Sequence, residues 1–266
     1  MEFLPYLCTV FEVEIPERSE AIMKKERIIS FLWQHFLLLI SLFIMTLGVA
    51  VSVRSLLGSS VISVLPYMFQ EAGAEGLVPA WTIGQYTYLL NALLVLGQIC
   101  VLRRRFEPIQ FCQLLVGFVF GSFIDMHIYL TRWLLPTEIW EKVLAQFVGC
   151  SLLGFGISLE VRCGSVTMPG DGFPVAVSRV SGAEFAKVKI SIDTSLVVLG
   201  IIASYTFFGE WKWHIIGIGT LFAMYYVGWM VRLVSRHIAW FDRVLRYRPG
   251  FRRYLYGLAR YLYGKR

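Results

Sequence analysis

The sequence predicts an all-helical membrane protein with about six transmembrane helices, arranged as two inverted three-helix repeats. Of its 266 residues 57% are hydrophobic and only 16% are charged, and the apolar residues form long uninterrupted runs. Each half of the chain also carries a piece broken by glycine and proline after its first apolar run. The two halves resemble each other in sequence, which is typical of a duplicated membrane fold.

Six apolar runs are long enough to cross a bilayer, which requires about 20 residues each. We place them at residues 30–53, 82–102, 108–131, 138–160, 186–208 and 213–236. The first three form membrane repeat 1 (30–131), and the last three form membrane repeat 2 (138–236). A cytoplasmic or interfacial segment (1–29) precedes them. A basic tail (239–266) follows, and its mixture of Arg, Tyr, Phe and Leu predicts an amphipathic helix on an anionic membrane surface.

Two pieces interrupt the apolar pattern, one at 56–69 and one at 164–196, in which the break lies around 168–174. The second places Asp171 among glycines and prolines, namely Pro169, Gly170, Gly172 and Pro174. Proline removes a backbone donor and glycine adds backbone freedom, so both oppose a continuous helix. Lipid tolerates such breaks only where protein or a water-filled cavity satisfies the freed backbone groups. We therefore expect two broken or re-entrant segments that line a site.

The two halves align at a constant offset. LGVAVSVRSLLGSS (47–60) matches LGFGISLEVRCGSV (153–166), which pairs Gly58 with Gly164 at an offset of 106 (164 − 58). Farther on, WTIGQYTYLLN (81–91) matches EFAKVKISID (184–193) and places Asn91 opposite Asp193. Because each repeat holds an odd number of spans, the two copies are expected to have opposite orientations.

Positive charge predicts the orientation of the spans. Lys and Arg cluster before the first span, after the second and fourth, and in the C-terminal tail. Since cytoplasmic loops retain Lys and Arg, both termini are predicted to be cytoplasmic. The expected location is the cytoplasmic (inner) membrane, which the chain crosses several times.

The strongest site candidates are charged residues in or near the second broken piece. Lys189 and Asp193 lie four residues apart, so they share one face of a helix and are expected to pair. Ionisable residues at membrane depth favour a function, although a structural ion pair is the alternative. Asp171 follows Pro169 and Gly170, where a carboxylate would either cap a helix or contact a substrate or proton.

Weaker candidates lie in the first half of the chain. Hydroxyl groups follow Gly58 in the first broken piece and would bind a polar ligand or satisfy the interrupted backbone; they belong to Ser59, Ser60 and Ser63. Asn91 is polar among apolar neighbours, and hydrogen bonding between helices is its commoner role. Asp125 continues a stripe of small residues, Gly117 and Gly121, which favours close helix packing and turns the carboxylate toward protein.

Several classes of protein are disfavoured. The sequence lacks the HExxH, GxxxxGK[ST] and GxSxG motifs, and its histidines are far apart, so we expect no enzyme, catalytic residue, metal or cofactor. The net charge of +7 arises from topology signals and the tail, so nucleic acid is not an expected partner. The five cysteines show no paired spacing and are expected to be free thiols.

Several segments resemble the YczE/YitT group of integral membrane proteins. They are GSSVISVLP, WTIGQYTYLLN, PIQFCQLLVGFVFGSFID, TMPGDGF and EFAKVKISID, within residues 30–236. The chain departs from the group's pattern at Val61, where proline is common, and at Ala186, where glycine is common. The resemblance implies a duplicated helical membrane protein of a largely uncharacterised group.

We therefore expect a secondary transporter or exporter of a small anionic or zwitterionic solute, bound near the midplane between the two broken helices. Helix N-termini around 58–66 and 168–174 would present free N–H groups to the solute. A non-transporting membrane assembly or regulatory subunit is the alternative. The expected partners are the lipid bilayer, anionic headgroups at the tail and the small solute, with a second copy of the chain as an open alternative.

Overall fold

The computed structural model describes residues 17–163 and 167–245. In these residues every regular element is a helix, and turns and loops connect the helices. Two 3-10 turns, Arg103–Arg105 and Pro108–Phe111, connect α3 to α4. The helices are α1 (Glu17–Arg54), α2 (Val61–Ala74), α3 (Ile83–Leu102), α4 (Cys112–Leu130), α5 (Ile139–Cys163), α6 (Pro169–Ser181), α7 (Phe185–Phe208), α8 (Ile218–His237) and α9 (Ala239–Leu245).

Six of these helices are long and apolar enough to cross a membrane within the described part of the chain. They are α1, α3, α4, α5, α7 and α8, so the predicted all-helical membrane class and number of spans are confirmed. The boundaries differ at two places. The third span begins at Cys112, because the 3-10 turn from Pro108 precedes it, and the sixth begins at Ile218, because residues 209–217 form a turn.

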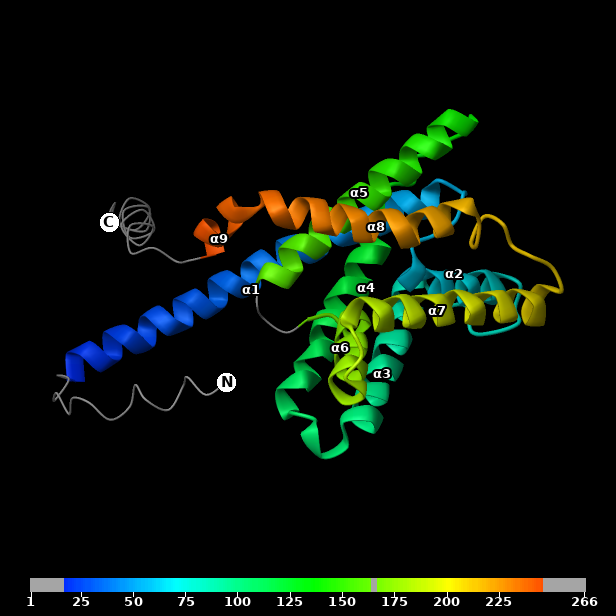
Figure 1. Ribbon diagram of the computed structural model, residues 1–266. Coiled ribbons are helices and arrows are strands. Elements are labelled where there is room, and N and C mark those ends of the chain that lie inside the picture. The colour runs from blue at the N-terminus through cyan, green and yellow to red at the C-terminus, as the bar shows by residue number, and fades with distance from the viewer. Residues whose placement is uncertain (1–16, 164–166, 246–266) are drawn as a thin grey trace.

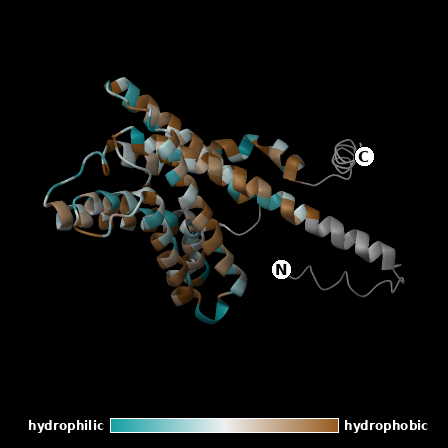
Figure 2. Cartoon of the chain, turned by 180° about the vertical axis from the view of Figure 1, so that it is seen from behind, coloured by the Kyte–Doolittle hydropathy of each residue, from teal (hydrophilic) through white to brown (hydrophobic). Residues whose placement is uncertain are grey.

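The outward faces of the long helices are apolar. Large hydrophobic side chains are exposed on α4, α7 and α8, among them Leu115, Ile202 and Leu221. Figure 2 shows hydrophobic residues along the long helices and hydrophilic residues gathered at turns and helix ends. In water such a surface would be unfavourable, so the exposed faces fit contact with lipid.

Helices α1 and α5 lie side by side at the centre of the molecule (Figure 1). They run antiparallel, because Ser41 near the middle of α1 contacts Cys163 at the end of α5, whereas Ser52 near the end of α1 bonds to Gln146. Glycine allows the close approach. A Cβ atom on Gly48 would lie 2.5 Å from the Leu153 backbone nitrogen.

The remaining helices form two groups around this central pair (Figure 1). One group contains α3, α4 and α6, and the other contains α2 and α7, while α8 packs along α5. Each short helix therefore lies against a long helix of the other half of the chain: α2 contacts α7, and α6 contacts α3. Because each short helix packs on the other half of the chain, both interrupted segments lie toward the middle of the fold.

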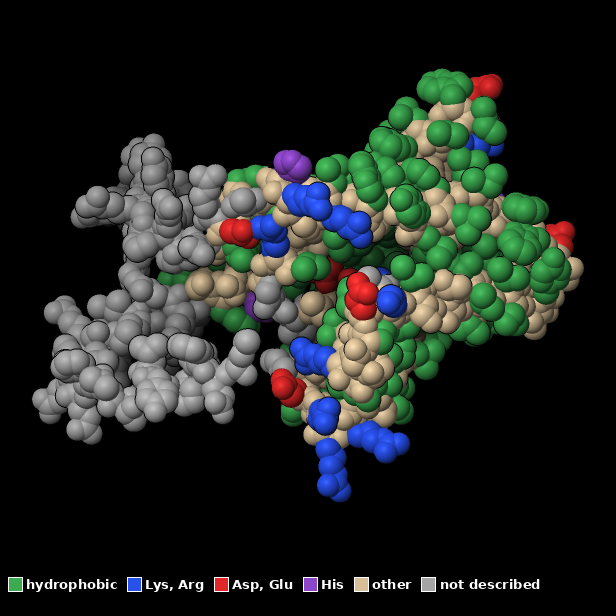
Figure 3. Space-filling view, viewed as in Figure 1, with side chains coloured by type: hydrophobic (Ala, Val, Ile, Leu, Met, Phe, Trp, Pro, Cys, Tyr) green, Lys and Arg blue, Asp and Glu red, His purple; other side chains and the backbone are tan. Residues whose placement is uncertain are grey.

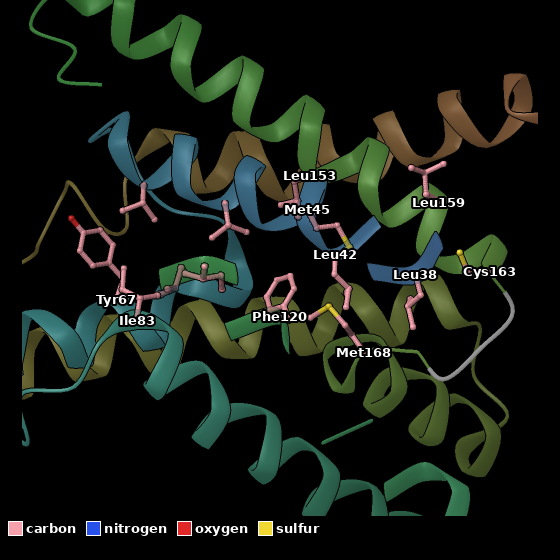
Figure 4. Packing of buried hydrophobic residues seen from close by; sticks show 14 of the residues in the cluster. Leu38, Leu42, Met45, Tyr67, Ile83, Phe120, Leu153, Leu159, Cys163 and Met168 are labelled. Carbon is pink, nitrogen blue, oxygen red and sulfur yellow. The ribbon is translucent and has the colours of Figure 1, made fainter. Parts of the chain in front are cut away.

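The buried core joins the central pair to the start of α6. Leu42 of α1, Phe120 of α4 and Met168 lie close together (Figure 4), and each is at most 2% exposed. Met168 immediately precedes α6, so its side chain fixes the beginning of that helix in the core. The first turn of α6 is thereby placed beside α5.

Ion pairs hold the far end of α2 and the beginning of the basic tail. Lys212 lies 2.9 Å from Glu210 and 3.7 Å from Glu75 at the end of α2. The hydrogen bond from Lys212 keeps the pKa of the Glu210 carboxyl below its ordinary value. At the opposite end, Asp242 of α9 pairs with Arg162 of α5. The predicted amphipathic tail beyond Leu245 and the segment 1–16 lie outside the described residues.

We predict that Gly48→Ala destabilises the protein, because the new Cβ atom would meet the backbone of α5. Overpacking of this kind costs about 1–3 kcal/mol. The unfolding temperature in detergent, followed by tryptophan fluorescence, should fall. Gly228→Ala is the matched control, since a Cβ atom there would meet nothing within 4 Å. Equal unfolding temperatures for the two variants would contradict the close crossing.

Candidate functional site

The first turn of α6 is the centre of the candidate site. Pro169 is the first residue of the helix, where its missing N–H leaves no backbone bond unmade. Asp171 lies in the same turn, and the backbone N–H groups of Asp171 and Gly172 donate to the Met168 carbonyl. The segment that was predicted to break the helical pattern therefore starts a separate short helix, α6, and does not continue α5 or α7.

A lysine from α7 lies between two carboxylates. The Lys189 ammonium is 3.2 Å from the Asp171 carboxylate and 3.1 Å from the Asp193 carboxylate, and it donates to the Gly170 carbonyl at 3.4 Å. The predicted pairing of Lys189 with Asp193 is therefore confirmed. The contact with Asp171 joins α7 to the broken piece, and we call Asp171, Lys189 and Asp193 the triad.

The triad is partly accessible. Its side chains are 31% exposed at Lys189, 23% at Asp171 and 21% at Asp193. Figure 3 shows acidic and basic side chains on the surface where α6 meets α7. The exposed ion pair of Glu184 and Lys187 also lies at this end of α7, so these surface charges are not those of the triad alone. A small polar molecule can therefore approach these groups from the surface of the protein.

A fourth charged group, Glu160, lies behind the triad near the end of α5. Its side chain is only 3% exposed, and one carboxylate oxygen accepts a 2.8 Å hydrogen bond from the Met168 N–H. The other oxygen, Oε2, makes no hydrogen bond to any described residue. Asp171 and Lys189 are the charged groups that act on it electrostatically. The Lys189 ammonium pairs with Asp171 and Asp193, and no ion pair to Glu160 is found among the described residues.

The start of α2 reaches the same region. A Cβ atom on Gly170 would lie 2.4 Å from the end of the Ile62 side chain, so the second residue of α2 touches the second residue of α6. No side chain caps the start of α2. The beginning of α2 therefore offers backbone N–H groups close to the beginning of α6.

The candidate serines are engaged within the protein. Ser59 donates to the Ile215 carbonyl through its backbone and side chain, at 2.9 and 3.3 Å. Ser60 and Ser63 bond to each other at 2.7 Å. Gly58 has a φ of +132° and lies against Thr220, so a larger residue would be strained there. These contacts favour the alternative that the hydroxyls satisfy the interrupted backbone.

Two other candidates lie away from the triad. Asn91 is 2% exposed, faces Gly117 of α4, and makes no side-chain hydrogen bond to the described residues. Asp125 accepts hydrogen bonds from the Thr82 hydroxyl at 2.6 Å and the Gly84 N–H at 2.8 Å, which caps the start of α3. The prediction that the stripe containing Asp125 packs against another helix is confirmed.

A separate pocket of about 170 Å³ lies where α1 ends. Arg54 and Tyr67 line it together with the loop 134–137. The Arg54 guanidinium donates to the Ile128 carbonyl at 2.8 Å. The structure thus places a single cation at the end of α1 and a buried carboxylate near the end of α5.

Glu160 is the site residue that sequence reasoning left out. It stands at the end of the fourth apolar run, where a charged residue is ordinarily expected at the membrane interface. Only its place after Gly156 on one helical stripe hinted that it faces protein. Its contact with Met168 depends on how the segment after α5 turns back, which the local pattern does not specify.

We predict that Lys189→Met destabilises the protein more than Lys187→Met. The first change leaves two carboxylates without their cation, which costs about 1–3 kcal/mol. Lys187 is a matched control on the same helix, because its side chain is 81% exposed. Thermal unfolding of both variants in the same detergent measures the difference. Equal stability would show that the triad contributes nothing to folding.

The comparisons with known proteins place this geometry in a family. Residues 32–236 match a family described as a family of unknown function (DUF6198). No curated protein and no solved structure matches the chain. The resemblance to the YczE/YitT group therefore stays a prediction. Because the match spans all six candidate membrane helices almost completely, the chain belongs to this family of unknown function.

Proposed function

We propose that this integral membrane protein is a secondary transporter of a small solute that binds where α2 and α6 begin. The observation that carries the proposal is the triad, in which Lys189 of a long helix lies between Asp171 of the broken segment and Asp193. Charged groups are costly at membrane depth, and those that remain there commonly bind substrates or ions.

The inverted repeat predicted from the sequence is a second argument for this proposal. The offset of 106 makes Gly48 equivalent to Gly154. Helices α1 and α5 cross where Gly48 meets Leu153, the residue next to Gly154. The helix contacts are also reciprocal between the two halves. The short helix α2 of the first half packs on α7 of the second half, and the short helix α6 of the second half packs on α3 of the first half. Two glycines repeat the pattern in detail: Gly97 of α3 receives Phe173 of α6, and Gly200 of α7 receives Val64 of α2. Alternating access would follow from rocking one group of helices against the other.

Convergence of the broken pieces supports a site near the midplane. Since α1 and α5 are antiparallel, they end on opposite sides of their crossing. The chain after each helix must therefore turn back for Ile62 and Gly170 to touch. Two segments that approach each other in this way are what the predicted re-entrant arrangement requires, and their contact is an argument for it.

The charges favour a zwitterionic solute over a purely anionic one. The N-terminus of α6 already faces the Glu160 carboxylate and carries Asp171 in its first turn. The uncapped start of α2 is the remaining partner for an anionic group. A cationic group of the same solute would lie beside Asp171 and Asp193 in competition with Lys189.

A second candidate is a non-transporting assembly or regulatory subunit that uses its basic tail. The observation in its favour is that α9 is tied to the membrane helices by the Arg162–Asp242 pair and by a 2.9 Å hydrogen bond from Trp33 to Val244. These contacts hold α9, the described beginning of the tail, against the membrane helices. A stoichiometric partner that co-purifies with the protein would favour this role.

We predict uptake of at least one member of a panel of radiolabelled zwitterionic and anionic amino acids by proteoliposomes that contain the purified protein. Asp171→Asn and Asp193→Asn should each reduce it at least about tenfold, because each removes a charged contact worth about 1.5–3 kcal/mol. Lys187→Gln is the control, as its parent side chain is exposed.

Correct folding of each variant is checked by a single symmetric peak in size-exclusion chromatography. Uptake that is equal in the wild type and both aspartate variants would exclude the triad as the binding site. No uptake of any panel member, together with a stoichiometric partner protein, would overturn transport in favour of the subunit.

A further inference from the structure

We propose that Glu160 is the proton-binding site of this protein and that its proton controls how firmly the start of α6 is held. The inference deepens the proposed transport function, since it names the coupling ion. It depends on two features of Glu160: a buried oxygen without a partner among the described residues, and a second oxygen bonded to the Met168 N–H.

A proton is the ligand that fits the free oxygen. The Glu160 side chain is 3% exposed, so an ionised carboxylate there would lack both water and a paired cation. Lys189 is already engaged by Asp171, Asp193 and the Gly170 carbonyl. A metal ion needs several oxygen ligands, and no group of three or more His, Cys, Asp or Glu residues in the described chain is arranged to hold one.

The groups that face Glu160 define when it binds the proton. Asp171 on α6 and Lys189 on α7 are the charged groups that face it from neighbouring helices. Cys163, one turn along α5, lies between Glu160 and Ser41 of α1. Binding adds a proton from hydronium to Oε2 and leaves water, and release reverses this step.

The second oxygen links the proton to the backbone. A hydrogen bond to a carboxylate is roughly twice as strong as one to a neutral acid. The ionised form of Glu160 therefore holds the Met168 N–H firmly, and the protonated form holds it weakly. Because Met168 leads directly into Pro169 and Gly170, proton uptake loosens the same turn that contacts α2 and Lys189.

The test uses the purified full-length protein in detergent without any solute. Infrared difference spectra between high and low pH should contain a protonated-carboxyl band that disappears in Glu160→Gln and shifts in Glu160→Asp. Glu141→Gln on the same helix is the matched control, because Glu141 is bonded to Thr137 and Glu138 near the other end of α5. It should keep the band.

Hydrogen exchange provides the second measurement. After correction for intrinsic exchange, the peptide containing Met168 should be more protected at high pH than at low pH in the wild type, and equally weakly protected at both in Glu160→Gln. A band that survives in Glu160→Gln, or protection that does not depend on pH, would overturn the inference. Since no solute is present, these results are independent of transport. Solute flux without the Glu160 band would reject the proton site but keep the transport function. The band without any flux would keep the proton site and reject the transport function.

Discussion

The close antiparallel crossing of α1 and α5 is the constraint on which the rest of the structure depends. Their backbones approach so closely at Gly48 and Gly149 that neither position has room for a side chain. In a bilayer there is little hydrophobic drive between helices, so close packing and hydrogen bonds must hold them together. Gln146 adds such bonds by accepting from Ser52 of α1 and from Ser55, which follows α1, and by donating to the Gly219 carbonyl. With this pair fixed, the end of each helix has a defined place.

The interrupted segments are stable because the protein itself satisfies their backbone. Before α2, the Leu57 carbonyl accepts from the Gly219 N–H, and Ser59 bonds to Ile215. Before α6, the Glu160 carboxylate accepts a hydrogen bond from the Met168 N–H. The two solutions differ in chemistry: α2 is held by neutral backbone groups of the turn before α8, whereas α6 is held by a carboxylate. Only the second solution responds to protonation, so the two halves are unequal despite their related sequences.

Sequence patterns were sufficient for the parts of the fold that depend on local composition. The length of the apolar runs located the six spans, and helical spacing placed Lys189 beside Asp193. The contacts of Asp171 and Glu160 depend instead on the path of residues 164–168 after α5, which glycine and proline permit but do not specify. The serines after Gly58 show the same limit. Their hydroxyls were equally consistent with a ligand or with the backbone until Ile215 was seen to lie within reach.

The chemical difference between the two halves is relevant to the proposed transport, because transport in one direction requires the two sides of the site to differ. The offset that aligns the two broken pieces makes Arg54 the equivalent of Glu160, since 54 + 106 = 160. Arg54 lines a pocket at the end of α1 and bonds to Ile128, while Glu160 is buried against α6. Residues of opposite charge type at equivalent positions would give the two ends of the proposed pathway opposite electrostatic character. A permanently charged guanidinium cannot bind and release a proton near neutral pH, whereas a buried carboxyl group can. Proton control therefore belongs to the α6 side alone, and the α2 side provides a fixed positive charge.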